Sequence, residues 1–191
     1  MGGIFTEALV VFEIESSGGK NEVVVRFSAA SFNSVGVIVS QSTQLWQLPD
    51  GKKVTRRAFA KHKIATQHTK HGLNALDQLD LVDALLKNFK ERGLQVVAHD
   101  GKRVTRLLEQ TAVAHMADWT LPYPITCLKT ISTRILNLKG KASHAPRPPT
   151  ATELFRYLHK QPCKLSETEP SESMNLTALN FLAAQKRGWI R

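Results

Sequence analysis

The sequence predicts an α/β fold in which helices flank a mixed sheet made of an antiparallel meander and parallel strands. Three segments near the N-terminus, residues 9–15, 23–27 and 35–39, have the length and composition of strands. Apolar residues then recur at helical spacing over residues 75–92, directly before another apolar run at 95–98. A helical crossover joins parallel strands, so we expect the run at 95–98 to lie beside a central strand at 9–15.

Further helices are expected at residues 103–116, 130–137, 150–160 and 175–187. Thr150 and Glu153 fit a capping box at the start of the third of these helices. A loop is expected at 47–55, around the turn Pro49-Asp50-Gly51, and an exposed acidic loop is expected at 166–173. The 191 residues suit one domain spanning residues 1–191, with its core at about 8–189.

Composition excludes several classes of protein. No run approaches the roughly 20 apolar residues of a membrane span, so we expect no membrane partner. The first residues lack the pattern of a secretory signal. Cys127 and Cys163 lie far apart and indicate reduced thiols in an intracellular compartment, with nucleus and cytoplasm both open.

Two acids end the first apolar run. Residues 8–12 lead into Glu13 and Glu15, whose side chains would point to the same face of a strand. Open α/β sheets place their sites at the carboxyl ends of strands, and paired carboxylates there often hold a divalent cation. The alternative is a solvated strand end, because the turn residues 16–19 follow at once.

Three short segments carry a resemblance to a known family. They read, in order, Phe12-Glu13-Ile14-Glu15-Ser16, then His71-Gly72-Leu73, then Ala98-His99-Asp100 with Val104 four residues later. This resembles the DEDD family of 3′–5′ exonucleases, which includes proofreading subunits and oligoribonuclease-type enzymes. The family's first motif is Phe-Asp-x-Glu-Thr and its second is Ala-His-Asn-x-x-Phe-Asp. The resemblance implies a ribonuclease H-like fold and a cleft in which carboxylates hold two metal ions.

The chain departs from the family at several functional positions. Glu13 stands where the family has a metal-bridging aspartate, and Val104 stands where its second motif has an acid. The third motif, His-x-Ala-x-x-Asp, aligns with residues 175–180 and places Asn175 and Asn180 at its two functional positions. An asparagine at position 175 has no titratable nitrogen with which to act as a general base.

Of the four family carboxylates, only Glu15 is unchanged. Two-metal hydrolysis needs negative ligands, and two carboxylates hold at most one hydrated Mg²⁺. We therefore expect a catalytically silent domain without a cofactor. The alternative is an active but remodelled exonuclease that uses Mg²⁺ or Mn²⁺, with Asp100 or Glu172 joining Glu13 and Glu15. His99 is expected to support the strand end, and Asp100 to cap the following helix.

The net charge of +10 is concentrated unevenly. Between Asp50 and Asp77 the chain has no acid, and this basic tract contains Lys52, Lys53, Arg56, Arg57, Lys61, Lys63 and Lys70. Such tracts attract phosphate backbones, so DNA or RNA is the expected partner, alone or within a larger nucleoprotein assembly. A merely solvated surface is the alternative. Trp46, beside the tract, is a candidate for stacking on a base.

Overall fold

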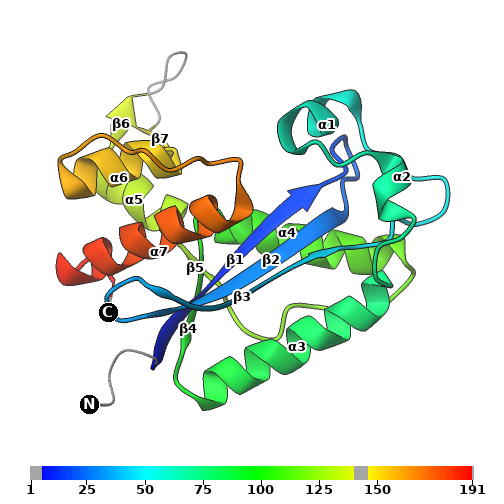
Figure 1. The fold of residues 1–191 in the computed structure, drawn as a ribbon, viewed down its shortest axis with the longest axis horizontal. Coiled ribbons are helices and arrows are strands. Elements are labelled where there is room, and N and C mark those ends of the chain that lie inside the picture. The colour runs from blue at the N-terminus through cyan, green and yellow to red at the C-terminus, as the bar shows by residue number, and fades with distance from the viewer. Residues whose placement is uncertain (1–5, 140–145, 191) are drawn as a thin grey trace.

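The structure is a computed structural model that describes residues 6–139 and 146–190. A five-stranded mixed sheet occupies its centre, in the order β3-β2-β1-β4-β5 (Figure 1). The strands are β1 (Glu7–Ser16), β2 (Val24–Asn33), β3 (Ile38–Leu45), β4 (Gln95–Ala98) and β5 (Thr126–Cys127). Strands β6 (Leu138–Lys139) and β7 (Pro146–Arg147) form a separate antiparallel pair.

Strand β1 is central, as predicted. It pairs antiparallel with β2 and parallel with β4, where Val10 lies opposite Val96. Strands β2 and β3 complete the antiparallel meander. The parallel pairing follows from the crossover through helix α3 (Ala75–Glu91), whose apolar stripe packs against the sheet. The predicted α/β architecture is therefore confirmed.

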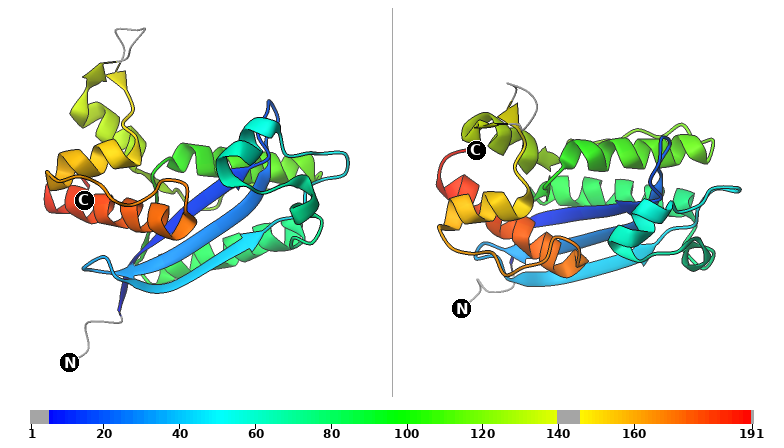
Figure 2. Two further views of the ribbon diagram at one scale, coloured as in Figure 1. Left: turned by 45° about the horizontal axis from the view of Figure 1, so that its top comes forward. Right: turned by 90° about the horizontal axis from the view of Figure 1, so that it is seen from above.

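Two helical layers cover the sheet, one on each face (Figure 2). On one face, Val10, Phe12 and Ile14 of β1 pack against α3 and α4 (Gly101–Ala114). On the other face, Leu9 and Val11 pack against α6 (Ala151–His159) and α7 (Pro170–Lys186). Because side chains alternate along a strand, Glu13 and Glu15 belong to the face that α7 covers.

The meander differs from the prediction in its bounds. Strand β2 continues to Asn33 and not only to residue 27, and β3 runs over Ile38–Leu45 where 35–39 was predicted. Gly36, at positive φ, lies in the turn between the two strands. Pairing of the Ser- and Ala-rich part of β2 with both neighbours overrides its weak local preference for a strand.

The predicted helices are present, with shifted ends. Helix α5 (Leu128–Leu136) begins two residues early, and α7 already begins at Pro170, inside the expected acidic loop. The Thr150–Glu153 capping box of α6 is confirmed. Two short helices, α1 (Arg56–His62) and α2 (Thr66–Thr69), were not predicted, because the basic tract that contains them has no long apolar period.

The segment around Gly72 forms an isolated parallel bridge with Trp46, just after the end of β3. The Leu73 N–H donates to Leu45 O, and the Gln47 N–H donates to Leu73 O, both at 2.8 Å. A side chain at Gly72 would meet the backbone carbon of Trp46 at 2.7 Å, so only glycine permits this approach. Trp46 is fully buried and stacks on Phe27, so the expectation that it stacks on a base was wrong.

Candidate functional site

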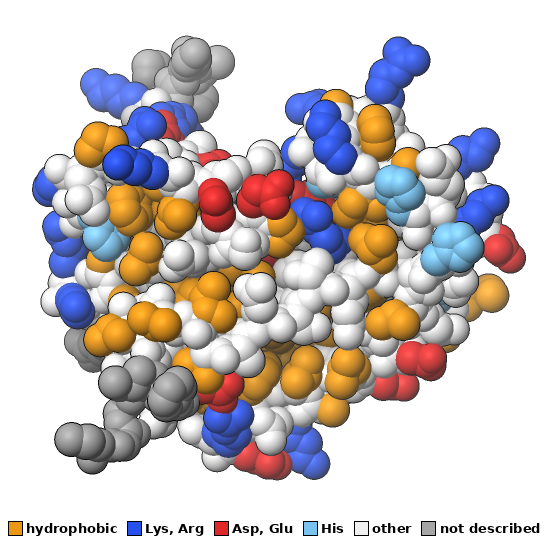
Figure 3. Space-filling view, viewed as in Figure 1, with side chains coloured by type: hydrophobic (Ala, Val, Ile, Leu, Met, Phe, Trp, Pro, Cys, Tyr) orange, Lys and Arg blue, Asp and Glu red, His pale blue; other side chains and the backbone are white. Residues whose placement is uncertain are grey.

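A cleft of about 330 Å³ opens at the carboxyl ends of β1 and β4. Its lining comes from both strands, from α1 and α4, and from α7 with the loop before it. Figure 3 shows this face of the molecule hollowed between the lobe of α1 and the lobe of α6 and α7. The sheet thus brings the predicted strand-end residues to one place, as open α/β sheets do.

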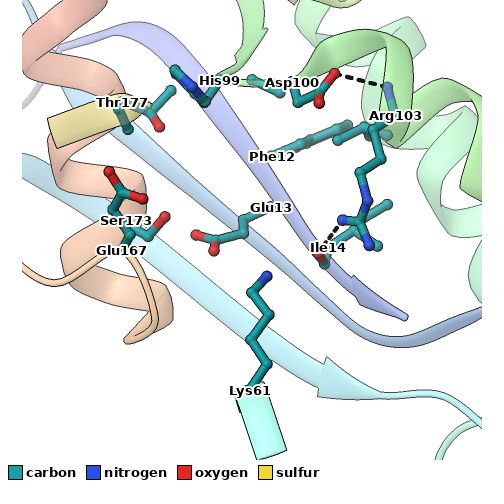
Figure 4. Close-up of a pocket in the computed structure, with 13 residues that line it drawn as sticks. Phe12, Glu13, Ile14, Lys61, His99, Asp100, Arg103, Glu167, Ser173 and Thr177 are labelled. Atoms are coloured by element: carbon teal, nitrogen blue, oxygen red, sulfur yellow. Dashed lines mark hydrogen bonds between the residues drawn. The ribbon is translucent and has the colours of Figure 1, made fainter. Parts of the chain in front are cut away.

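Glu13 points into the cleft toward Ser173 of α7 (Figure 4). Its Oε2 atom is buried and has no hydrogen-bond partner among the described residues. Burial, together with the charge of Glu15, raises the pKa of Glu13 to about 7, although Ser173, Arg26 and Lys61 act in the opposite direction. Near neutral pH this carboxyl therefore exists in both protonation states, unlike an ordinary glutamate.

Glu15 is only 3% exposed and lies in an ion pair. The Lys61 ammonium, at the end of α1, reaches both carboxylate oxygens of Glu15 at 3.2 Å. Arg26 lies directly opposite Glu15 on β2, which places a second cation beside the same strand end. Lys61, predicted as a nucleic-acid contact, is thus also the partner of the one unchanged family acid.

Asp100 follows β4 and caps α4, because its side chain accepts from the Arg103 N–H at 3.3 Å. Its other oxygen accepts a short hydrogen bond from the Lys129 ammonium. Burial raises the pKa of Asp100, but Lys129 outweighs this effect and holds the pKa below its usual range. The strand-end acids Glu15 and Asp100 therefore each carry a lysine partner.

His99 also lies at the end of β4, and its contacts are structural. Its Nε2 lies 3.2 Å from Pro149 O, just before α6, and burial lowers the pKa of its ring. Val104 also lines the cleft and is buried, with 5% of its surface exposed. A valine contributes no ligand atom, so this wall of the cleft offers apolar surface.

The two asparagines aligned with the family's third motif, Asn175 and Asn180, do not face the cleft. Asn180 is fully buried, and its Nδ2 donates to Ala151 O at 2.9 Å. Neither Asn175 nor Asn180 is among the described residues that line the cleft. The residues of α7 that line it are Ser173 and Thr177, one helical turn apart. This wall therefore offers hydroxyl groups.

The acid that borders the cleft on the side of α7 is Glu167, where Glu172 was expected. Glu172 does not line the cleft, and its Oε2 accepts from the Ser166 N–H at 2.7 Å. Glu167, in the preceding loop, does line the cleft and accepts from the Thr152 N–H. Figure 4 shows its carboxylate on the same side as Ser173.

Most of the basic tract is exposed, as its position after the turn at 49–51 suggested. Lys52 is half-buried, and the exposed members are Lys53, Arg56, Arg57, Lys61, Lys63 and Lys70. Helix α1 carries Arg56, Arg57 and Lys61 beside the end of β1 (Figure 1). Lys61 is the member of the tract that lines the cleft, and α1 with the loop before it forms a basic wall beside the cleft.

A second cavity of about 430 Å³ adjoins the first. The two cavities share Lys61 and Arg103, and the second extends to Arg57 and the turn Gly18-Gly19. Arg103 donates to Ile14 O at 3.3 Å and to Ser16 Oγ at 2.9 Å, so it is fixed to β1. Together the cavities make a groove that runs from Glu167 past Lys61 to Arg57.

Sequence reasoning missed Arg103, Glu167, Ser173 and Thr177, which line this groove, and Arg26 and Lys129, which lie beside the acids Glu15 and Asp100. The position of Arg26 could have been predicted from the sequence, because the antiparallel register after the turn at 17–21 sets it opposite Glu15. The others depend on loops and on helix rotation, for which the sequence offers no comparable signal.

The residues present do not match the donor set of a two-metal centre. Among the residues that the structure describes, no three His, Cys, Asp or Glu side chains gather in a way that could hold a metal ion. Lysine ammonium groups also occupy oxygens of Glu15 and Asp100, which a metal would need.

Within residues 6–139 and 146–190, no helix is long and apolar enough to cross a membrane.

Comparison with known proteins supplies structural neighbours only. No family profile matches the sequence, and no curated protein matches it. The nuclease domain of 3′hExo, a DEDDh family member solved with rAMP, matches with a TM-score of 0.70 at 8% identity. That match covers 100% of this chain and 98% of the other.

Two further matches bind DNA in their solved structures. E. coli exonuclease I, in complex with a dT13 oligonucleotide, matches with a TM-score of 0.68 at 12% identity over 95% of this chain and 42% of that chain. Exonuclease X, in complex with 5′ overhanging duplex DNA, matches with a TM-score of 0.60 at 14% identity over 95% and 94%. The chain therefore has the ribonuclease H-like fold of the DEDDh 3′–5′ exonucleases.

Proposed function

We propose that this chain is a catalytically silent exonuclease-fold domain that binds nucleic acid, alone or within a nucleoprotein assembly, through the basic wall of its cleft. The observation that carries the proposal is the pairing of Glu15 with Lys61. A phosphodiester hydrolase of this fold needs that carboxylate for a cation, whereas here a side chain neutralises it. Val104, aligned with the acid of the family's second motif, lines the cleft without a ligand atom and supports the same conclusion.

The charge of the groove favours a phosphate backbone as its ligand. Helix α1 and the loop before it present exposed cations in the tract that contains no acid. Phosphate contacts of this kind are independent of sequence and weaken as salt rises. Structural neighbours bind a histone mRNA stem-loop, a single-stranded oligonucleotide and duplex DNA. The fold therefore accommodates both RNA and DNA, and the proposal extends that capacity to this chain.

The test is fluorescence anisotropy with labelled single-stranded DNA and RNA in the presence of EDTA. We expect micromolar affinity that falls steeply with salt. Reversing Lys53, Arg56 and Arg57 to Glu should weaken binding by more than about tenfold and lower the salt slope by about 0.7 for each lost phosphate contact. The matched control reverses three exposed lysines outside the groove, Lys87, Lys164 and Lys186, and should change affinity far less. Equal losses in both triple variants would contradict a specific basic wall.

An active, remodelled exonuclease is the second candidate. It is favoured by the buried Glu13 Oε2, which has no hydrogen-bond partner within residues 6–139 and 146–190, and by Glu167, which borders the same cavity. We expect no shortening of labelled oligonucleotides in Mg²⁺ or Mn²⁺. If the wild type shortens oligonucleotides from the 3′ end and Glu15→Ala abolishes this activity, the second candidate replaces the silent-domain proposal.

A further inference from the structure

Lys61 has a role that nucleic-acid binding by a surface tract does not explain. Its ammonium contacts both oxygens of Glu15, although more than half of its side chain is exposed and free to extend into solvent. Phosphate binding by an exposed lysine does not require that the lysine also contact a buried acid. The contact therefore calls for an explanation in terms of the acids at the end of β1.

Helix α1 is fixed in the place that this contact requires. His62, the next residue, is buried, with Nε2 3.1 Å from Ser16 O and Nδ1 accepting from the Ile64 N–H at 3.1 Å. At the other end of the helix, the Thr55 N–H donates to Ser17 O at 2.8 Å. Both anchors lie on the residues directly after Glu15. The position of Lys61 is therefore set by the same strand end that carries the acids.

The surroundings of the ammonium are those of a cation site. Glu13 and Glu15 point to the same face of β1, and Glu13 Oε2 is buried with no hydrogen-bond partner in the part of the chain that the structure describes. An ammonium has three donors, and the contact with Glu15 leaves donor capacity directed to the cleft. Lys129 makes the corresponding contact with Asp100 at the end of β4. Each of these two strand ends thus has its own lysine.

We propose that Lys61 is a resident cation that takes the charge position of a divalent ion beside Glu13 and Glu15 and excludes such an ion from the cleft. This inference rests on the proposed function, since a metal-dependent enzyme would need Glu15 to be free. It adds that one side chain, Lys61, prevents metal binding and can be removed by mutation. Removing the ammonium leaves Glu13 and Glu15, with Glu167 bordering the same cavity and Arg26 as the cation that remains beside the strand end.

Mn²⁺ titration followed by electron paramagnetic resonance tests the proposal, because the signal of free Mn²⁺ falls as the ion binds. Lys61→Met keeps an unbranched side chain, one atom shorter than lysine, and removes its charge. We expect it to bind Mn²⁺ at least about tenfold more tightly than the wild type, because a unit charge a few ångströms from the ion is lost. Lys61→Gln provides a second uncharged variant if the first folds poorly, with folding checked by circular dichroism.

Three controls make the result specific. Lys61→Arg keeps the charge and should still exclude Mn²⁺. Lys87→Met removes an exposed charge from α3 on the opposite face of the sheet and should bind Mn²⁺ as the wild type does. Adding Glu15→Gln to Lys61→Met should abolish the gained binding. Wild-type binding as tight as that of Lys61→Met, no gain in either uncharged variant, or an equal gain in Lys61→Arg would each overturn the proposal.

The titration is independent of nucleic acid, so the two proposals fail separately. If oligonucleotides do not bind in EDTA but Lys61→Met gains Mn²⁺ binding, the nucleic-acid function fails and the resident cation stands. If oligonucleotides bind through the basic wall but no uncharged variant gains Mn²⁺ binding, the resident cation fails alone.

Discussion

Helices α1 and α7 form opposite walls of the cleft, yet they are attached to the sheet in different ways. Helix α7 has 17 residues, of which seven are buried, and it packs into the core that includes Leu9 and Val11 of β1. Helix α1 has seven residues, of which only His62 is buried, and hydrogen bonds to the end of β1 hold it. The cations lie on α1, the wall that contributes little to the core. They can therefore be substituted without loss of the fold.

A matched pair of phenylalanines tests this difference most directly, and it should give the largest effect. Phe181 on α7 is 2% exposed, and Phe59 on α1 is 43% exposed. Phe181→Ala should lower the free energy of unfolding by about 3–5 kcal/mol, because it leaves a cavity in the core. Phe59→Ala should change it by about 0.5 kcal/mol or less. Urea denaturation measures both, and similar losses would show that α1 is as much part of the core as α7.

The second prediction concerns the acid between the two walls. Burial raises the pKa of Glu13 from 4.5 to about 7, so the folded protein binds its proton more tightly than the unfolded chain does. The stabilisation from this proton is complete below about pH 4.5 and is lost as the pH rises through 7. Glu13→Gln, which resembles the protonated form, should remove this pH dependence.

The gain from Glu13→Gln should therefore be small near pH 4.5 and greatest near pH 8, where it amounts to at most about 3 kcal/mol. Urea denaturation at several pH values measures it. Glu22→Gln provides a control of opposite sign. Burial raises the pKa of Glu22, but Ser16, Arg106 and Arg103 outweigh it and lower the pKa. Its replacement should therefore cost most above the ordinary pKa of 4.5 and least once the pH has fallen through the lowered pKa. A constant effect of Glu13→Gln at every pH would contradict the raised pKa.

The sequence predicted the sheet end of the cleft better than its walls. The run before Glu13 and the helical period at 75–92 are local patterns, and they suffice to place β1 beside β4. The N-terminal cap at Asp100 is also local, since a short polar side chain before a helix satisfies its first N–H groups. Such features depend on residues within a few positions of one another.

The walls depend on contacts that no local pattern specifies. Lys61 and Glu15 are 46 positions apart, and Lys129 and Asp100 are 29 apart, so loop paths decide whether they meet. On α7, each residue turns the helix by about 100°, so a small error of register exchanges the side chains that face the cleft. Asn175 and Asn180 were expected at the cleft, and the residues of α7 that line it are Ser173 and Thr177.

The smallest expected effect concerns the start of α1. Thr55 Oγ1 accepts from the Ala58 N–H at 3.2 Å and caps the helix. Thr55→Ala should cost about 1 kcal/mol locally, because an N–H group loses its partner. Since α1 adds little to the core, the loss should appear as faster amide hydrogen exchange in α1 while α7 keeps its protection.

Thr150→Ala provides the matched control, because Thr150 caps α6, which packs in the same core as α7. That change should cost a similar amount, but it should appear in the global free energy of unfolding and not only in local exchange. If Thr55→Ala accelerates exchange equally in α1 and α7, the two walls open as one cooperative unit. The attachment of α1 would then be no weaker than that of α7, and the contrast between the walls would be limited to their charge.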